Sequence, residues 1–531
     1  MVDGAVKRLR NRFRALPQGE VALPPSEWAR SGIYLGMDSA ARFLTDGMPV
    51  RRGDWWQDAI LEGQRTVRGV DLTEATALML AGPGGHKTLG WLLGLAGLQD
   101  WPGPVLALST KTDLARLAGP RRERLGKVQV LDWRGELAAA LPYSRVRWDP
   151  LDGCEVAGVC KDRMTSMMET VELGRPPAEA IWAVLAVGAL TAWAHAAALE
   201  GSGIERVLGW LRKDELAEPQ RILKAKGSRA GFGEDLAALG GKAEDTRQSI
   251  LHSARPVLAA LGDPEVLDGC TPDLLNPAFD INTFLDSTDS LFVCDEGGES
   301  ATSPLAPLTV ALVNAIVKKA KLQAAATPAG PGRLAGRLAR PLLVVIDEVA
   351  NISPLPNLVQ VFSQARGHGI AIAVAAQSWS QLTERWGAPG AVAIWDTAAY
   401  RLIGAGLQDM DFLTDVSKSL GEKQVWRPSV GSQSGGSGSS GAARNGKSES
   451  HTLVETPNFK ASALAALPEG KAMLLGRGVA RPVQLPALPS LLEAMERAEE
   501  RAAHQAEADL HSALAAPRAA PSRWSRLRDV L

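Results

Sequence analysis

Short runs of apolar residues, with no polar residue between them, recur along this chain. The clearest run is Leu342 to Ile346. A strand buried on both faces of a parallel sheet has this pattern, whereas a half-exposed strand alternates apolar and polar positions. Further strands are predicted at Thr76 to Ala81, Val105 to Leu108, Val128 to Leu131, Ser290 to Cys294, Ile370 to Ala376 and Lys471 to Leu475, the last completing the sheet before Pro482.

The stretches between these runs have helical patterns. From Pro176 to about Asp263 we expect helices only, at Ile181 to Leu199, Ile204 to Arg212, Glu218 to Lys226 and Thr246 to Leu261. Closer to the C-terminus, Pro307 to Ala324 and Leu358 to Ala365 are also expected to be helical. Strands alternating with helices are typical of an α/β fold with a parallel sheet. The uninterrupted helical stretch predicts an all-α insertion in that fold.

Polar side chains follow two of the predicted strands. Asp347 and Glu348 come directly after Leu342 to Ile346, and Gln377 follows Ile370 to Ala376. Ligands of open α/β sheets bind outside the carboxyl ends of the strands. In a P-loop ATPase, the first acid of such a pair holds Mg²⁺ and the next polarises the attacking water. The alternative is a strand end whose acids are simply solvated.

The order strand, acid pair, helix, strand and glutamine is RecA-like. The Gln377 amide could sense a phosphate or orient a water. Arg366 is expected in the glycine-flanked turn Arg-Gly-His-Gly, from which it could extend to a neighbouring subunit.

A glycine-rich loop follows the first predicted strand. Gly82, Gly84 and Gly85 precede Lys87 and Thr88, and an apolar helix is expected from Leu89 to Leu98. In a phosphate-binding loop, backbone N–H groups cradle phosphates, the lysine neutralises charge and the hydroxyl ligates Mg²⁺.

The loop departs from the usual spacing. The pattern Gly-x-x-x-x-Gly-Lys-Thr requires glycine where the chain has Ala81 and His86, and alignment on Gly82-Pro83 leaves the loop one residue short. A side chain at position 86 restricts the backbone and adds bulk where phosphate must pass. Nucleotide binding is therefore either weakened or retained through a rearranged loop. We favour retention, because the lysine, the threonine, both acids and the glutamine occur together.

Four segments resemble one known family. The sequences IDEVANI, LPNL, RGHGI and VAAQSWSQLTERWG, within Pro341 to Gly387, are similar to the C-terminal nucleotide-binding half of TraG-like coupling proteins of type IV secretion systems. This family lies in the FtsK/HerA-like P-loop superfamily. Its members are ring-forming motors that link a relaxase–DNA complex to a secretion channel.

The resemblance implies a RecA-like P-loop domain that uses ATP and Mg²⁺. It also implies single-stranded DNA with its relaxase and accessory proteins, secretion channel components and a homohexamer as partners. Residue by residue, it implies phosphate and Mg²⁺ contacts for Lys87 and Thr88, Mg²⁺ for Asp347, water activation for Glu348, γ-phosphate for Gln377 and a neighbour's phosphate for Arg366.

Two other functions fit the same residues. One is a coupling adaptor that docks relaxosome proteins and no longer hydrolyses ATP. The other is a different hexameric P-loop enzyme, such as a secretion-assembly ATPase or a chromosome translocase. The net charge of −1 over 531 residues does not indicate a nucleic-acid partner, so binding of DNA would require a local basic surface.

The chain predicts a cytoplasmic location, or a peripheral one at the inner face of the cell membrane. Its basic N-terminal segment has no apolar core behind it, and its four cysteines suggest neither disulfides nor zinc. Ile181 to Leu199 is nearly long enough to span a bilayer, but it carries Thr191 and His195 and is flanked by glutamates. We interpret it as a buried core helix, which leaves membrane attachment to a partner.

The expected organisation has five parts. They are an N-terminal basic helix and irregular region (1–60), the first part of the nucleotide-binding domain (61–175), the all-α insertion (176–270), the second part of that domain (271–490), and a charged helix with a disordered Arg-rich tail (491–531). Ser429 to Ser450 is rich in glycine and serine and is expected to be a linker-like loop within the fourth part.

Overall fold

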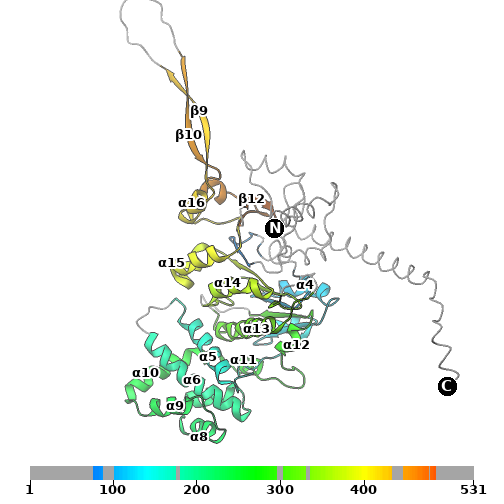
Figure 1. Ribbon diagram of the computed structural model, residues 1–531, viewed down its shortest axis with the longest axis vertical. Coiled ribbons are helices and arrows are strands. Elements are labelled where there is room, and N and C mark those ends of the chain that lie inside the picture. Colours follow the sequence, from blue (N-terminus) through cyan, green and yellow to red (C-terminus); the bar gives the residue numbers. More distant parts are fainter. Residues whose placement is uncertain are drawn as a thin grey trace, which may run out of the picture.

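A computed structural model describes residues 76–85, 87, 98, 101–174, 180–295, 303–330, 335–432, 447–476 and 479–485 (Figure 1). The predictions for residues 1–60 and 491–531 lie outside this part of the chain. The helix expected at Leu89 to Leu98 lies outside it too, apart from its last residue.

A ten-stranded sheet forms the centre of the molecule, in the order β12-β11-β8-β1-β7-β6-β2-β5-β3-β4. Neighbouring strands from β8 to β4 are parallel, and β11 is antiparallel to both β8 and β12. The predicted α/β fold with a parallel central sheet is confirmed. The strands are β1 (Thr76–Leu80), β2 (Val105–Ser109), β3 (Val128–Asp132), β4 (Ser144–Arg145), β5 (Ser290–Cys294), β6 (Leu342–Ile346), β7 (Ile370–Ala376), β8 (Tyr400–Gly404), β11 (Lys471–Gly476) and β12 (Val479–Gln484).

Both faces of the sheet are covered, which explains the unbroken apolar runs. In β6, Leu342, Val344 and Ile346 belong to one buried cluster, whereas Leu343 and Val345 belong to another. Alternate residues of a strand point to opposite faces, so a strand between two cores must be apolar at every position. The first core is supplied by helices α5 (Ala157–Glu172), α13 (Ala306–Ala326), α14 (Leu358–His368) and α15 (Trp379–Thr397), and the second by α4 (Asp113–Arg122).

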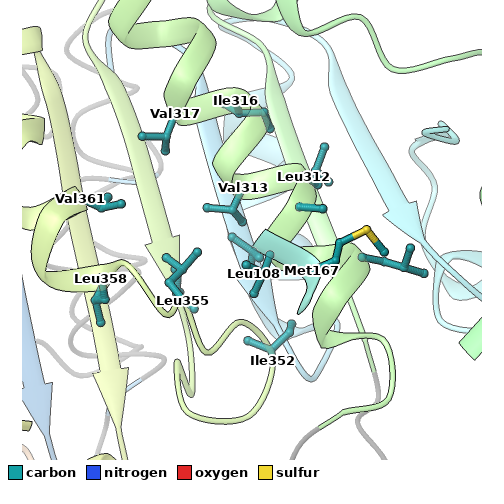
Figure 2. Close-up of a cluster of buried hydrophobic side chains, with 14 of the residues drawn as sticks. Leu108, Met167, Leu312, Val313, Ile316, Val317, Ile352, Leu355, Leu358 and Val361 are labelled. Atoms are coloured by element: carbon teal, nitrogen blue, oxygen red, sulfur yellow. The ribbon is translucent and has the colours of Figure 1, made fainter. Parts of the chain in front are cut away.

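Figure 2 shows part of the first core. Leu312, Val313, Ile316 and Val317 of α13 lie beside Leu108 at the end of β2, with Met167 of α5 close by. The same figure shows Ile352, Leu355, Leu358 and Val361, which extend this core along the segment after β6. The segment that carries the acid pair is therefore anchored by apolar contacts on both sides of its turn.

A layer of helices lies between β4 and β5 in the chain. It comprises α6 (Ala180–Glu200), α7 (Ile204–Lys213), α8 (Ala217–Ala225), α9 (Phe232–Gly240), α10 (Glu244–Ala254), η4 (Arg255–Gly262) and α11 (Pro264–Gly269), followed by α12 (Ile281–Leu285). The helix expected from Thr246 to Leu261 is in fact two elements, because Pro256, in the first turn of the 3₁₀ helix η4, lacks the N–H that a continuing α-helix would need.

Helix α6 is the centre of this layer, and it packs against α5, α7, α8, α9 and α10. Its Trp193 is fully buried, and the ring nitrogens of His195 lie 2.8 Å from the Cys154 carbonyl and 3.1 Å from the Ser228 hydroxyl. Among the described helices, this is the one that is long and apolar enough to cross a membrane, with a mean hydropathy of 1.6. Two thirds of that apolar window is buried inside the molecule, as a core helix requires.

Two expectations near the C-terminus were wrong. Pro482 does not follow the sheet but lies within β12, opposite Met473; β12 is the edge strand, where a residue without an N–H is tolerated.

The Gly/Ser-rich segment is also not a loop throughout. Its two ends belong to the antiparallel strands β9 (Glu422–Ser432) and β10 (Lys447–Pro457), whose backbones pair along their full length and project from the body beyond α16 (Met410–Ser419) (Figure 1). Residues 433–446 between them are not described.

Candidate functional site

The predicted site residues come together because three neighbouring strands end level with one another. Leu80 of β1 lies opposite Ala376 of β7, and Ile346 of β6 lies opposite Val374 of the same strand. The loop after β1, Gln377 after β7 and the acid pair after β6 therefore leave the same edge of the sheet side by side. This is the edge at which α/β folds bind ligands.

Asp347 is a buried carboxylate at this edge, with an exposed fraction of 6%. Its backbone N–H donates to Leu108, and its Oδ2 atom lies 3.5 Å from the Ser109 hydroxyl at the end of β2. Ser109 was not among the residues predicted from the sequence, although its place at the end of a predicted strand could have suggested it. A carboxylate with a hydroxyl beside it is the kind of oxygen donor set that Mg²⁺ prefers.

Glu348 is held between two amide side chains. Nε2 of Gln377 donates to its Oε1 atom, and Nδ2 of Asn351 donates to its Oε2 atom at 3.1 Å. The backbone of Glu348 is left-handed, with φ at 58°, which is uncommon for any residue other than glycine. Residues in such conformations cluster at functional sites.

The glycine-rich loop Gly82 to Gly85, predicted to hold phosphate and called the phosphate loop below, is packed against the segment that follows β8. The N–H of Gly82 donates to Ala405 at 2.9 Å, and that of Gly85 donates back to Gly82 at 3.0 Å. A Cβ at position 82 would lie only 2.5 Å from the Gly406 carbonyl oxygen, so the close approach of the two backbones requires glycine there. At the tip of the loop, Gly84 has φ at 74°.

Lys87 is folded into this loop, with an exposed fraction of 8%. Its ammonium group donates to the carbonyl oxygens of Ala81 at 2.7 Å and Gly82 at 3.0 Å. Burial lowers the pKa of Lys87, and the nearby charges of Asp347 and Glu348 oppose that shift. The lysine and both acids therefore share one electrostatic environment, while Thr88 and His86 lie outside the described residues.

A third carboxylate lies at the tip of the loop. An Oε atom of Glu469 is 3.4 Å from the position that a Cβ on Gly84 would occupy. Glu469 is exposed and belongs to the turn before β11, where Lys471 donates to Pro468. No local pattern in the sequence connects Glu469 with the loop.

Arg366 does not join this cluster. The structure places it on α14, which ends at His368, so the expectation of a glycine turn at this position was wrong. The helix runs back from the end of β6 to the start of β7, and Arg366 is therefore exposed near the opposite edge of the sheet. The RGHG sequence suggested a turn, but only Gly369 has the left-handed backbone that ends the helix.

Among the described residues there is no group of three or more His, Cys, Asp or Glu that could hold a metal ion. A magnesium site in a nucleotide-binding protein does not need one, because Mg²⁺ is bound by one or two protein oxygens together with phosphate oxygens and waters. Asp347 beside Lys87 and Ser109 fits that type of site.

The fold and this edge define the class of protein: an α/β protein with a mostly parallel sheet, in which β7 separates the strand β1, which carries the glycine-rich loop, from the acid-bearing strand β6. Residues 341–469 match the family described as the TraM recognition site of TraD and TraG. The resemblance to TraG-like coupling proteins, predicted from Pro341 to Gly387, is therefore confirmed.

One curated relative is the conjugal transfer protein TraG of Rhizobium radiobacter. It is 24% identical over 379 residues, which are 68% of this chain and 55% of the relative. The chain thus spans about half the length of this relative.

Solved structures of the bacterial conjugative coupling protein TrwB share the fold. An unbound form, which lacks its first 70 residues by its name, is 18% identical with a TM-score of 0.56, over 89% of this chain and 95% of the other. A complex of TrwB with the GTP analogue GDPNP is 20% identical with a TM-score of 0.56, over 86% and 94%. A complex with ADP and Mg²⁺ is 19% identical with a TM-score of 0.54, over 83% and 96%.

Proposed function

We propose that this chain binds ATP with Mg²⁺ at the carboxyl edge of β1, β7 and β6 and hydrolyses it. One observation carries the proposal: Lys87, Asp347 and Glu348 come from two strands that are not adjacent, yet they lie close enough to influence the pKa of the lysine. A cation and two carboxylates at the end of a parallel sheet suit a phosphate with its metal.

Each residue has a role that its place supports. Within the loop Gly82 to Gly85, the N–H groups of Gly82 and Gly85 are bonded inside the fold, so the N–H of Gly84 is the one proposed to meet a phosphate. Lys87 adds a third N–H donor beyond the two that meet loop carbonyls. Asp347, with the Thr88 hydroxyl, would hold Mg²⁺, which would neutralise charge on the phosphates.

Two further residues act on the attacking water. Glu348 orients and polarises the water. Gln377 donates to Glu348 and would also contact the γ-phosphate, so it links the presence of that phosphate to the position of Glu348. Arg366 is proposed to act only on a neighbouring subunit's phosphate, because it lies near the opposite edge of its own sheet.

We further propose that hydrolysis moves DNA. The TraG relative is named for conjugal transfer, and TrwB is named as a conjugative coupling protein. On this basis the chain acts as the coupling protein of a type IV secretion system and delivers relaxase-bound single-stranded DNA to the secretion channel. It would work as a homohexamer in the cytoplasm, at the inner face of the membrane, and a partner protein would attach it there.

The test is ATP hydrolysis by the purified full chain, with and without single-stranded DNA. Asp347→Ala is the inactive variant, and Asp411→Asn, an exposed acid on α16, is the matched control. We expect hydrolysis that increases with DNA in the wild type and in Asp411→Asn, and none in Asp347→Ala.

Binding of a labelled non-hydrolysable ATP analogue separates the alternatives. If the wild type neither binds the analogue nor hydrolyses ATP, the enzyme proposal is wrong and the adaptor role is favoured. Activity that is equal in Asp347→Ala would remove this edge of the sheet from the reaction.

A further inference from the structure

The carboxylate of Glu348 is fixed from two directions by amide groups. Gln377 reaches it from the end of β7, and Asn351 reaches it from the turn after β6, one donor to each oxygen. The proposed chemistry needs an oxygen of this carboxylate to face a water beside the phosphate. A carboxylate that accepts a hydrogen bond on each oxygen cannot rotate freely toward that water.

Asn351 is itself firmly placed. Its backbone N–H donates to the Glu348 carbonyl at 2.8 Å and closes the turn, and its own carbonyl accepts from Ser303 at 3.5 Å. Ser303 in turn donates through its hydroxyl to Asp295, a buried acid at the end of β5. The amide of Asn351 is therefore oriented toward Glu348 by the structure around it.

The same turn is bonded to helix α15, which begins after Gln377. Nε of Arg385 donates to the Ala350 carbonyl at 3.1 Å, and Nε1 of Trp386 donates to the Leu355 carbonyl at 2.8 Å. Directly after these residues, Gly387 interrupts α15 with φ at 69°. A shift of the first half of α15 would therefore move the turn that carries Asn351.

The left-handed backbone of Glu348 gives its carboxylate a second possible orientation, reached when that backbone relaxes. A left-handed conformation at a residue with a side chain persists only when its surroundings impose it. The two amides and the turn impose it here. If Asn351 withdrew, the backbone at Glu348 could relax and redirect the carboxylate.

We infer that Asn351 is a positioning residue that, together with Gln377, holds Glu348 in a restrained orientation, and that its release permits hydrolysis. This inference depends on the proposed ATPase function and adds a means of regulation to the same site. DNA, or contact with a neighbouring subunit, would act on the turn through α15, so that ATP is not consumed before the chain engages its substrate.

The experiment is steady-state ATP hydrolysis by Asn351→Ala without DNA. One charge-assisted hydrogen bond is lost, so we expect the basal kcat to rise by about 10-fold or more. KM for ATP should change by less than about 2-fold, because the described bonds of Asn351 are to Glu348 and Ser303 and none is to the described loop residues Gly82 to Gly85. The ratio of DNA-stimulated to basal rate should fall accordingly.

The matched control is Asn357→Ala, in the same segment. Its Nδ2 atom donates to Asn314 at 3.2 Å and does not contact Glu348. Asn351→Ser serves as a second, milder variant, and binding of a non-hydrolysable ATP analogue shows that each variant is folded at the site.

The outcomes separate the two ideas. A wild type that neither binds nor hydrolyses ATP refutes the proposed function. An active wild type with an equal or slower Asn351→Ala and Asn351→Ser, both still binding the analogue, refutes the restraint while the ATPase proposal stands. A faster basal rate in Asn351→Ala but not in Asn357→Ala supports it.

Discussion

Glu469 places a negative charge where the proposed nucleotide would add several more. Its carboxylate lies 3.4 Å from the Cβ position of Gly84, at the tip of the phosphate loop. A phosphate that accepts from the Gly84 N–H would lie about 3 Å beyond it, and hence about 7 Å from the carboxylate. We therefore expect Glu469→Gln to bind nucleotide more tightly than the wild type.

The magnitude follows from Coulomb's law. A unit charge and the net charge of about −2 on Mg–ATP repel each other by about 1 kcal/mol at 7 Å in water. This corresponds to about a 5-fold decrease in Kd for the variant. Because the carboxylate is exposed, the gain should shrink to less than about 2-fold in 0.5 M salt, where charges are screened beyond about 4 Å.

The assay is titration of the full chain with a fluorescent, non-hydrolysable ATP analogue at 0.05 M and 0.5 M salt. Glu205→Gln makes the same chemical change on α7, away from the sheet, and should leave Kd unchanged. Weaker binding by Glu469→Gln would mean that the carboxylate contacts the nucleotide favourably. An equal gain at both salt concentrations would show that the effect is not electrostatic.

Three further predictions concern the framework of the site. Arg122 is fully buried and its guanidinium donates to the Ser290 hydroxyl and to three main-chain carbonyls, so Arg122→Met should lower the free energy of unfolding by about 3–5 kcal/mol in urea titrations. Arg116→Met, exposed on the same helix, should change it by less than about 0.5 kcal/mol. The pKa of Asp149 is raised to about 6, mainly by burial, so the folded state binds its proton more tightly and loses stability as the pH rises from about 4 to about 6. The variant Asp149→Asn should remove that loss and be about 3 kcal/mol more stable at pH 7.5, as thermal or urea unfolding at several pH values would show. Finally, Gly82→Ala would place a Cβ 2.5 Å from a main-chain oxygen and should weaken ATP-analogue binding at least about 10-fold in the same titration, whereas Gly158→Ala, with no atom within 4 Å, should have no effect.

Local sequence determined which segments are strands and where their chemistry lies. A strand buried on both faces needs an unbroken apolar run, so β5, β6 and β7 could be located to the residue from composition alone. The first polar residues after such runs must lie at the carboxyl edge of the sheet. For this reason Asp347, Glu348 and Gln377 could be predicted from the sequence to lie together at that edge.

Local sequence was less informative where backbone pairing outweighs composition. The composition of the Gly/Ser-rich segment predicts a linker-like loop, yet its two ends belong to the paired strands β9 and β10. Pro482 was expected to follow the last strand of the sheet, yet it lies within β12. An edge strand needs only half of its N–H groups paired, so it can accommodate a proline. In both cases the deciding partner lies elsewhere in the chain.

Only the tertiary structure decided which residues meet at the site. Strand order is a non-local property, since any of the predicted strands could pair with any other and satisfy the same apolar pattern. The order β1-β7-β6 brings Lys87 within electrostatic range of Asp347, and the packing of β8 and the turn before β11 brings Glu469 to the loop. Asn351 was inaccessible to sequence reasoning for the same reason: its role depends on the left-handed backbone of Glu348, which the surrounding fold imposes.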